Sequence, residues 1–257
     1  MTAAPDTPPA PPRKPGLREA GAALSIPEFR RFWIGALVSN SGSWMQNVSV
    51  PFVLYQLTES ATWVGVASFA QFFPAVLVGP LGGSLADRYP RRSVLLVTQT
   101  LMAALALGLW ALWASGVAQP WSITALVACF GAVAGINIGS WQAFVSELVP
   151  RPLLLNAVTL NSAQFNGARA FGPALGGLVL ATLGPSGAFA LNALSFVAVL
   201  GALASIGHRP AAIDPTVERS SVLGETRETI TYIRRMPGIA ACVGVVAAIG
   251  FLGSPVF

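Results

Sequence analysis

Long apolar stretches separated by short clusters of charge predict an all-α membrane protein. Hydrophobic residues make up 54% of the 257-residue chain and charged residues only 10%, whereas a typical soluble domain carries about 25% charged residues. So few charges cannot coat a water-soluble globule of this size, which indicates a chain embedded in a bilayer. The net charge of +5 is divided among short clusters instead of following one face, which favours topology signals over nucleic-acid binding.

Six apolar runs are complete, and each is long enough to cross the bilayer as a helix. They lie near residues 32–57, 62–86, 93–115, 121–146, 154–183 and 186–207. A seventh run extends from Pro237 to Phe257. Residues typical of turns, such as the GPSG that begins at Gly184, separate neighbouring runs.

The runs divide the chain into four segments. Residues 1–27 are Pro-rich and polar at their start, which predicts a disordered cytoplasmic tail and not a cleavable signal peptide. Residues 28–207 are predicted to form a six-helix transmembrane bundle. Residues 208–236 carry apolar residues at helical spacing, which fits either an amphipathic helix at the cytoplasmic interface or a solvated linker helix. Residues 237–257 are the predicted seventh helix.

Arginine and lysine residues predict the orientation of the runs. They precede the first run and lie between the second and third, between the fourth and fifth, and after the sixth. The alternate loops, near Glu59, Gly116 and Gly184, contain neither residue type. The positive-inside rule makes the basic side cytoplasmic, which predicts a multi-pass protein of the inner cell membrane with a cytoplasmic amino terminus. Arg169, inside the fifth run, departs from this pattern.

The loop between the second and third runs, GGSLADRYPRR over residues 82–92, contains more charge than topology requires. Its three arginines fix the orientation of the neighbouring runs, but Asp87 contributes nothing to that orientation. An acid at a helix end, followed closely by basic residues, can form a charge network with neighbouring helix ends. Gly79, Gly82 and Gly83 just before it allow another helix to approach closely.

This loop resembles the signature loop between helices two and three of the major facilitator superfamily, whose pattern is roughly G-x-L-A-D-R-x-G-R-R. Pro90 stands where the family usually has glycine. The resemblance implies that Asp87 faces a helix end of the second half, that Arg91 pairs with Glu147, and that the network gates the cytoplasmic side. The implied gating residues are Gly83, Asp87, Arg88, Arg91, Arg92 and Glu147.

A second element, NGARAFGPALGG in the fifth run, resembles the G-P-x-x-G-G element of exporters in the same superfamily. The matching residues are Gly172, Pro173, Gly176 and Gly177. The surrounding sequence is similar to a bacterial subgroup that includes enterobactin-type siderophore exporters. The fold implied is the six-helix amino-terminal bundle of a major facilitator protein with a partial second half.

The function implied by the resemblance is secondary active transport by alternating access, with export of a small amphipathic compound such as a siderophore or drug. Protons are a possible coupling ion, although the fourth run lacks the arginine of the R-x-x-x-G motif found in many proton-coupled members. The superfamily normally has twelve helices with the site between two six-helix halves. The alternative is therefore a truncated, non-transporting fragment, or a half-transporter that needs the missing second half.

Polar residues inside the runs predict a cavity lining. Arg169 lies deep in the fifth run, where an arginine costs about 2.5–3.5 kcal/mol on insertion scales, and it shares a helical face with Ser162, Phe165 and Asn166. The alternatives are that Arg169 snorkels to the interface and that single polar residues only make contacts between helices. The candidate lining residues are Asn40, Trp44, Asn47, Asn137, Trp141, Asn166 and Arg169.

The sequence contains no constellation typical of an enzyme. It has no Walker A loop and no acidic pair of the kind that holds magnesium, and its one histidine, His208, is isolated. Cys129 and Cys242 both lie in apolar runs, so neither a disulfide framework nor a metal site is predicted. We therefore expect no catalytic residues and no cofactor, with a small-molecule substrate and the lipid bilayer as partners.

The arginine distribution predicts that the loop around Tyr89 faces the cytoplasm. A cysteine that replaces Tyr89 in a cysteine-free background should not react with a membrane-impermeant maleimide added to intact cells. It should react after the membrane is permeabilised. Labelling in intact cells would reverse the predicted orientation.

Overall fold

The computed structural model describes residues 20–207 and Gly238. Residues 20–207 are helical apart from short connections, and no strand occurs among them. The elements are η1 (Ala22–Ser25), α2 (Pro27–Thr58), α3 (Ala61–Arg88), α4 (Arg91–Ala114), α5 (Pro120–Glu147), η2 (Arg151–Leu153) and α6 (Leu154–Ser205). The predicted linker at 208–236 and the predicted seventh helix at 237–257 lie outside the described residues, except for Gly238.

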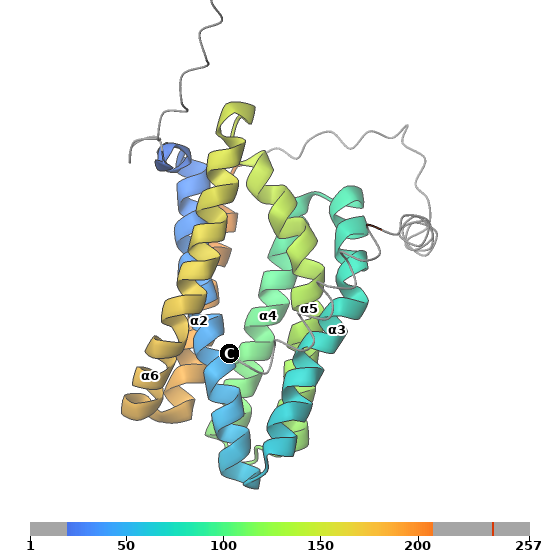
Figure 1. Ribbon diagram of the computed structural model, residues 1–257, viewed down its shortest axis with the longest axis vertical. Helices are drawn as coiled ribbons and strands as arrows, with labels where there is room; N and C mark the ends of the chain where they lie inside the picture. Colours follow the sequence, from blue (N-terminus) through green and yellow to red (C-terminus); the bar gives the residue numbers. More distant parts are fainter. Residues whose placement is uncertain (1–19, 208–237, 239–257) are drawn as a thin grey trace, which may run out of the picture.

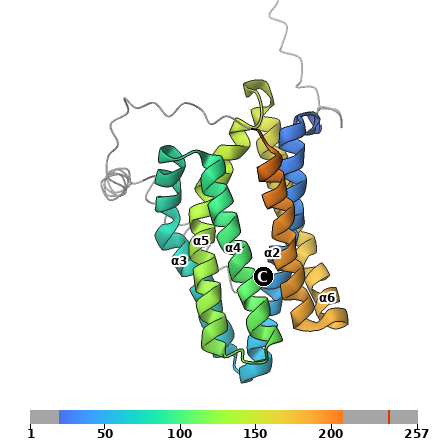
Figure 2. The same cartoon turned by 180° about the vertical axis from the view of Figure 1, so that it is seen from behind.

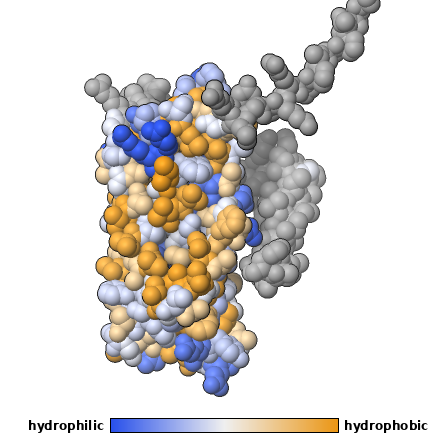
Figure 3. Space-filling model, turned by 90° about the vertical axis from the view of Figure 1, so that its left-hand side faces the viewer, coloured by the Kyte–Doolittle hydropathy of each residue, from blue (hydrophilic) through white to orange (hydrophobic). Residues whose placement is uncertain are grey.

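The helices follow the apolar runs of the sequence. Four stretches are long and apolar enough to cross a membrane by length and composition, namely α3, α4, α5 and Arg151–Ser205. A broad belt of hydrophobic side chains crosses the middle of the face shown in Figure 3, and strongly hydrophilic residues gather mainly toward its two ends. This distribution is typical of a multi-pass membrane protein.

A sharp reversal divides α6 into two arms. Gly184 has φ 67° and ψ −175°, a backbone conformation that is not helical, and Pro185 follows it. Glycine is suited to this position because a side chain would clash at positive φ. The first arm therefore spans residues 154–183 and the second 185–205, and the two run in opposite directions in Figures 1 and 2. The sequence predicted separate runs with a boundary at this place.

The turns between successive helices lie alternately at the two ends of the bundle. The turns after α2, after α4 and at Gly184 lie at the lower end of Figure 1. The start of α2, the α3–α4 turn, the α5–α6 turn and the end of α6 lie at the upper end. We call the upper end the arginine-rich end, because its turns and helix ends carry Arg30, Arg31, Arg88, Arg91, Arg92 and Arg151.

Two pairs of helices form the most extensive contacts. α2 packs against α6, and α3 packs against α5, while α4 contacts both α5 and α6. Helix pairs in a membrane gain little from the hydrophobic effect, so close packing at small residues contributes much of their association. Glycines make that packing possible in both pairs.

Glycines of α5 lie directly against the backbone of α3. A Cβ at Gly135 would lie 2.5 Å from the carbonyl oxygen of Ala75, and one at Gly139 would lie 2.9 Å from the backbone nitrogen of Gly83. A Cβ at Gly131 would collide with the carbonyl oxygen of Gln71. The two helices are therefore in backbone contact along several turns.

α2 makes equivalent close contacts with both arms of α6. A Cβ at Gly35 would lie 2.8 Å from the carbonyl oxygen of Ala198, in the second arm. On the first arm, a Cβ at Gly172 would collide with Trp44, and one at Gly176 would lie 3.1 Å from the Cα of Met45. The helix-five element thus supplies two contact glycines, whereas nothing lies within 4 Å of a Cβ built on its Gly177.

A faint repeat in the sequence corresponds to this pairing. The stretch GSWMQNVSV begins at Gly42 in α2 and GSWQAFVSE at Gly139 in α5, while GPLGG begins at Gly79 in α3 and GPALGG at Gly172 in α6. Each member of the first pair packs on a member of the second, since α2 contacts α6 and α5 contacts α3. Two related three-helix units would produce this pattern.

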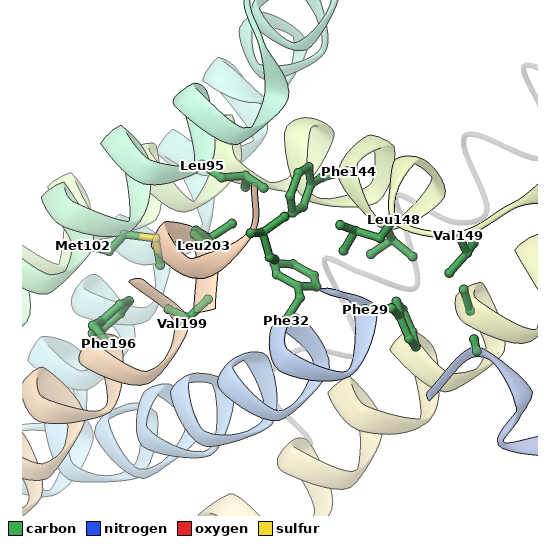
Figure 4. Packing of buried hydrophobic residues seen from close by; sticks show 14 of the residues in the cluster. Phe29, Phe32, Leu95, Met102, Phe144, Leu148, Val149, Phe196, Val199 and Leu203 are labelled. Carbon is green, nitrogen blue, oxygen red and sulfur yellow. The ribbon is translucent and has the colours of Figure 1, made fainter. Parts of the chain in front are cut away.

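Apolar side chains from four helices fill the bundle near the arginine-rich end. Phe32 of α2, Leu95 of α4, Phe144 of α5 and Leu203 of α6 are each 0–1% exposed and point toward one another (Figure 4). A second buried cluster, which includes Val53, Leu109 and Phe189, packs α2, α4, α5 and the second arm of α6.

The amino-terminal segment differs from the sequence prediction. Residues 20–26 were predicted to belong to the tail, but they form η1 and its flanks against the bundle. Ala23 is fully buried, and its N–H donates to Oδ1 of Asn156 at 2.8 Å, while Nδ2 of Asn156 donates to the carbonyl oxygen of Ala20. One asparagine of α6 thus anchors this segment, which composition alone did not indicate.

Because α3 and α5 are in backbone contact, adding one methyl group at Gly135 is predicted to lower the stability of the bundle substantially. Gly135→Ala should lower the free energy of unfolding by about 1–3 kcal/mol, the usual cost of overpacking. Gly65→Ala in α3 is the matched control, because nothing lies within 4 Å of its Cβ and alanine favours the helix. Thermal unfolding in detergent, followed by circular dichroism, should show a lower midpoint for Gly135→Ala only. Equal midpoints would contradict the packing.

Candidate functional site

Charged groups at the arginine-rich end connect the start of α4 to the end of α5. Arg91 is the first residue of α4 and Glu147 is the last residue of α5. Arg91 Nη1 donates to Glu147 Oε1, and the two side chains are 30% and 15% exposed. A positive charge is unfavourable at the amino-terminal end of a helix, and a negative charge is unfavourable at the carboxyl-terminal end. The pairing of Arg91 with Glu147 therefore offsets two unfavourable placements. The structure thus brings together the two residues that the resemblance had paired.

Arg92 points to a different helix. Its Nε donates to the carbonyl oxygen of Leu203 at 2.7 Å and its Nη2 to that of Ala204 at 3.2 Å. Arg31 of α2 donates from Nη1 to the carbonyl oxygen of Ser205 at 3.4 Å. Cationic donors therefore cap the carboxyl-terminal carbonyls of α6, where the helix dipole favours positive charge. Backbone acceptors leave no mark in a sequence, so this role was not predicted.

The remaining residues of the predicted gating set lie on α3. Asp87 is exposed in the last turn, and Arg88 beside it is half-buried. Gly83 meets α5 through its backbone, which Gly139 approaches. The expectation that Asp87 faces a helix of a second half concerns residues other than the described ones and stays a prediction.

Arg169 lies in the middle of the first arm of α6, beside α2. It comes fifteen residues after Leu154, where α6 begins, which places it about 22 Å along the helix axis. Its Cζ is 5.7 Å from the centre of the Trp44 ring, and Phe165 makes an edge contact with the same ring at 6.3 Å. The arrangement joins a cation and two aromatic rings from two helices, with Asn166 exposed one turn before Arg169.

Three predicted lining residues make hydrogen bonds between helices. Asn47 accepts from Gln71 Nε2 at 2.9 Å, joining α2 to α3. Trp141 Nε1 donates to Asn161 Oδ1 at 3.1 Å, joining α5 to α6. Asn137 is buried in the contact between α4 and α5.

Asn137 accepts two hydrogen bonds from α4. Thr98 Oγ1 donates to its Oδ1 at 2.8 Å and Gln99 Nε2 at 3.2 Å, and Asn137 is only 9% exposed. A helical period gives the angle of a residue about its own axis but not which neighbour covers that angle. Asn40, by contrast, is half-buried, and Asn166 donates only to the carbonyl oxygen of Ser162 in its own helix.

Several buried amide side chains could not be predicted from the sequence. Asn192 Nδ2 in the second arm of α6 donates to Gln46 Oε1 of α2 at 2.6 Å, and both residues are at most 4% exposed. Gln164 in the first arm is 2% exposed and has no hydrogen-bond partner among the described residues. A polar residue within an apolar run is the only signal that marks such positions. Among the described residues, no group of three histidine, cysteine or acidic side chains is placed to hold a metal ion.

Comparison with known proteins assigns the chain to a family. The profile of the major facilitator family described as "transmembrane secretion effector" matches residues 19–256. The enterobactin exporter EntS of Shigella flexneri is 28% identical over 209 residues, which are 74% of this chain and 46% of the relative. The staphyloferrin A transporter of Staphylococcus aureus is 26% identical over 161 residues, 62% of this chain and 41% of the relative.

The name of a third relative refers to a different class of compound. The macrolide efflux protein A of Streptococcus pyogenes is 24% identical over 240 residues, which are 89% of this chain and 56% of the relative. The chain spans about half the length of the curated relatives that it matches.

The ion pair at the arginine-rich end should show measurable coupling. A double-mutant cycle with Arg91→Ala and Glu147→Ala should give a coupling energy of about 1 kcal/mol for unfolding in detergent. The coupling should fall as salt is added, because the pair is partly exposed. Arg91→Ala combined with Glu59→Ala is the control, since Glu59 lies at the opposite end and should give no coupling. Equal coupling energies in both cycles would contradict a specific interaction between Arg91 and Glu147.

Proposed function

The chain belongs to the transmembrane secretion effector family of major facilitator transporters, and we propose that it acts in secondary active export of a small amphipathic compound. The observation that carries this proposal is the match over residues 19–256, which covers nearly the whole chain. The six helical segments of residues 27–205 would form the amino-terminal bundle of the transporter. The siderophore and macrolide transporters among its relatives support export of a siderophore-like or drug-like compound.

The proposed gate lies at the arginine-rich end, on the cytoplasmic side. Alternating access requires contacts that hold one side closed and can be released. The Arg91–Glu147 pair supports this role, because it joins two helix ends through partly exposed charges. Asp87 is exposed beside it and would face the second half of the transporter. Release of such contacts would open the cytoplasmic side without unfolding either helix.

The proposed substrate contact lies around Arg169, near the middle of the membrane. An arginine at that depth is costly on a lipid-facing surface, and Trp44 and Phe165 flank it from two helices. We infer that this group faces the central cavity, where Arg169 contacts either an anionic part of the substrate or a structural charge partner. Asn40 and Asn166 would add polar groups to the same lining.

Substitution of Arg169 tests this proposal. In cells that express the protein, Arg169→Ala should abolish efflux of the substrate, whereas Arg169→Lys should retain part of the efflux. Lysine keeps the charge but lacks the planar fork of donors. The measurements are substrate binding and efflux of a siderophore and a macrolide at matched membrane abundance.

Arg151→Ala is the matched control for the loss of a positive charge, because Arg151 is exposed at the arginine-rich end. It should export like the wild type. Wild-type efflux by Arg169→Ala would show that Arg169 only snorkels to the interface.

A further inference from the structure

We propose that Arg92 is a positioning residue that fixes the last turn of α6, at the arginine-rich end of the bundle. Its consequence for transport rests on the proposed function, because Arg92 is the neighbour of Arg91 in the proposed gate. Arg91 and Arg92 are neighbours in the sequence but bind different helices, α5 and α6. The start of α4 therefore holds two helix ends at once.

The end of α6 needs outside donors. The last four carbonyl groups of an α-helix have no partner within the helix, and such groups are costly near the hydrocarbon region. The residue after α6, Ile206, has an extended backbone with φ −85° and ψ 108°, so the left-handed cap that often binds these carbonyls does not form. Arg92 supplies donors to two consecutive carbonyls, and Arg31 supplies one to the next.

Buried apolar side chains also anchor the last turn of α6. Leu203 and Ile206 are both fully buried, in the cluster that contains Leu95 of α4. The guanidinium group orients the carbonyls while these side chains anchor the turn. An arginine that only signalled topology would need no such geometry, since its charge in the loop would suffice.

The bonds of Arg92 also connect the two packing units of the bundle. One unit is α2 with α6 and the other is α3 with α5, and α4 contacts both α5 and α6. Arg91 binds the second unit through Glu147, and Arg92 binds the first through Leu203 and Ala204. A change at the proposed gate would thus reach the end of α6 directly.

A buried cysteine reporter tests the role of Arg92 without any transport assay. Ile206→Cys would be placed in the full 257-residue chain with Cys129→Ser and Cys242→Ser, and its reaction with a water-soluble maleimide would be timed in detergent. The exposed position Gly207→Cys gives the rate of an unprotected thiol. We expect Ile206→Cys to be protected, and Arg92→Gln to raise its rate about tenfold or more, because hydrogen bonds to a charged donor are lost.

Two variants make the result specific to the guanidinium of Arg92. Arg92→Lys should give intermediate protection, because an ammonium group can bind one carbonyl but lacks the fork. Arg91→Gln removes the neighbouring charge and the bond to Glu147, but it should leave the rate within about twofold of the parent, since the bonds from Arg92 to the α6 carbonyls remain.

A distant reporter separates a local effect from loss of the fold. Val53→Cys lies in the second buried cluster and is fully buried, so it should stay protected in Arg92→Gln. Equal protection of Ile206→Cys with and without Arg92 would overturn the proposal. The proposal would also be overturned if Arg91→Gln raised the Ile206→Cys rate as much as Arg92→Gln does, or if Val53→Cys became reactive in Arg92→Gln. A third contradicting result would be an Ile206→Cys rate equal to that of Gly207→Cys when Arg92 is present. None of these outcomes depends on whether the protein exports a substrate.

Discussion

Backbone contact between helices at glycine residues is the constraint on which the rest of the bundle depends. In a bilayer, apolar side chains gain little by leaving lipid for a neighbouring helix, so association depends on packing and on polar contacts. Gly131, Gly135 and Gly139 bring α5 against α3, and Gly35 and Gly172 are among the residues that bring α2 against the two arms of α6. These contacts set how far apart the helix ends lie at either side of the membrane.

The polar contacts of the arginine-rich end follow from that spacing. A guanidinium group can reach a carboxylate or a helix carbonyl on another helix only when the two ends are close. Arg91 reaches α5 and Arg92 reaches α6 because α4 lies against both helices. Their partners differ in kind, since one is a carboxylate side chain and the other is a row of backbone carbonyls. The first contact suits a gate and the second suits a permanent attachment.

The sequence predicted the helical segments well, because an apolar run of fixed length and a Gly-Pro break are strong local signals. The boundary at Gly184 and the ends of α3, α4 and α5 lie within a few residues of the predicted ones. The pairing of Arg91 with Glu147 came from a family resemblance and not from spacing, because the two residues are 56 positions apart. Contacts to backbone, such as those of Arg92, leave no pattern in the residue types, and neither does the anchoring of η1 by Asn156.

The polar residues within the spans show most clearly that residue types alone do not predict contacts between helices. Asn137 and Asn166 both interrupt apolar runs, yet Asn137 is buried against Thr98 and Gln99, while Asn166 is exposed. What separates them is the position of α4, which covers one face of α5 and leaves the face of α6 that carries Asn166 uncovered by the described helices. Hydropathy cannot supply that information, because it describes each helix alone.

The arrangement of α6 links the proposed substrate contact to the proposed gate. Its first arm carries Arg169 beside Trp44 of α2, and its second arm ends in the carbonyls that Arg92 binds. Both arms pack on α2 through contacts that leave no space for a side chain at Gly35 or Gly172. A unit packed this closely moves as one body more readily than it deforms. A shift of α2 and α6 around a bound substrate would therefore be carried to the arginine-rich end, where Arg92 and Arg91 connect it to α4 and α5.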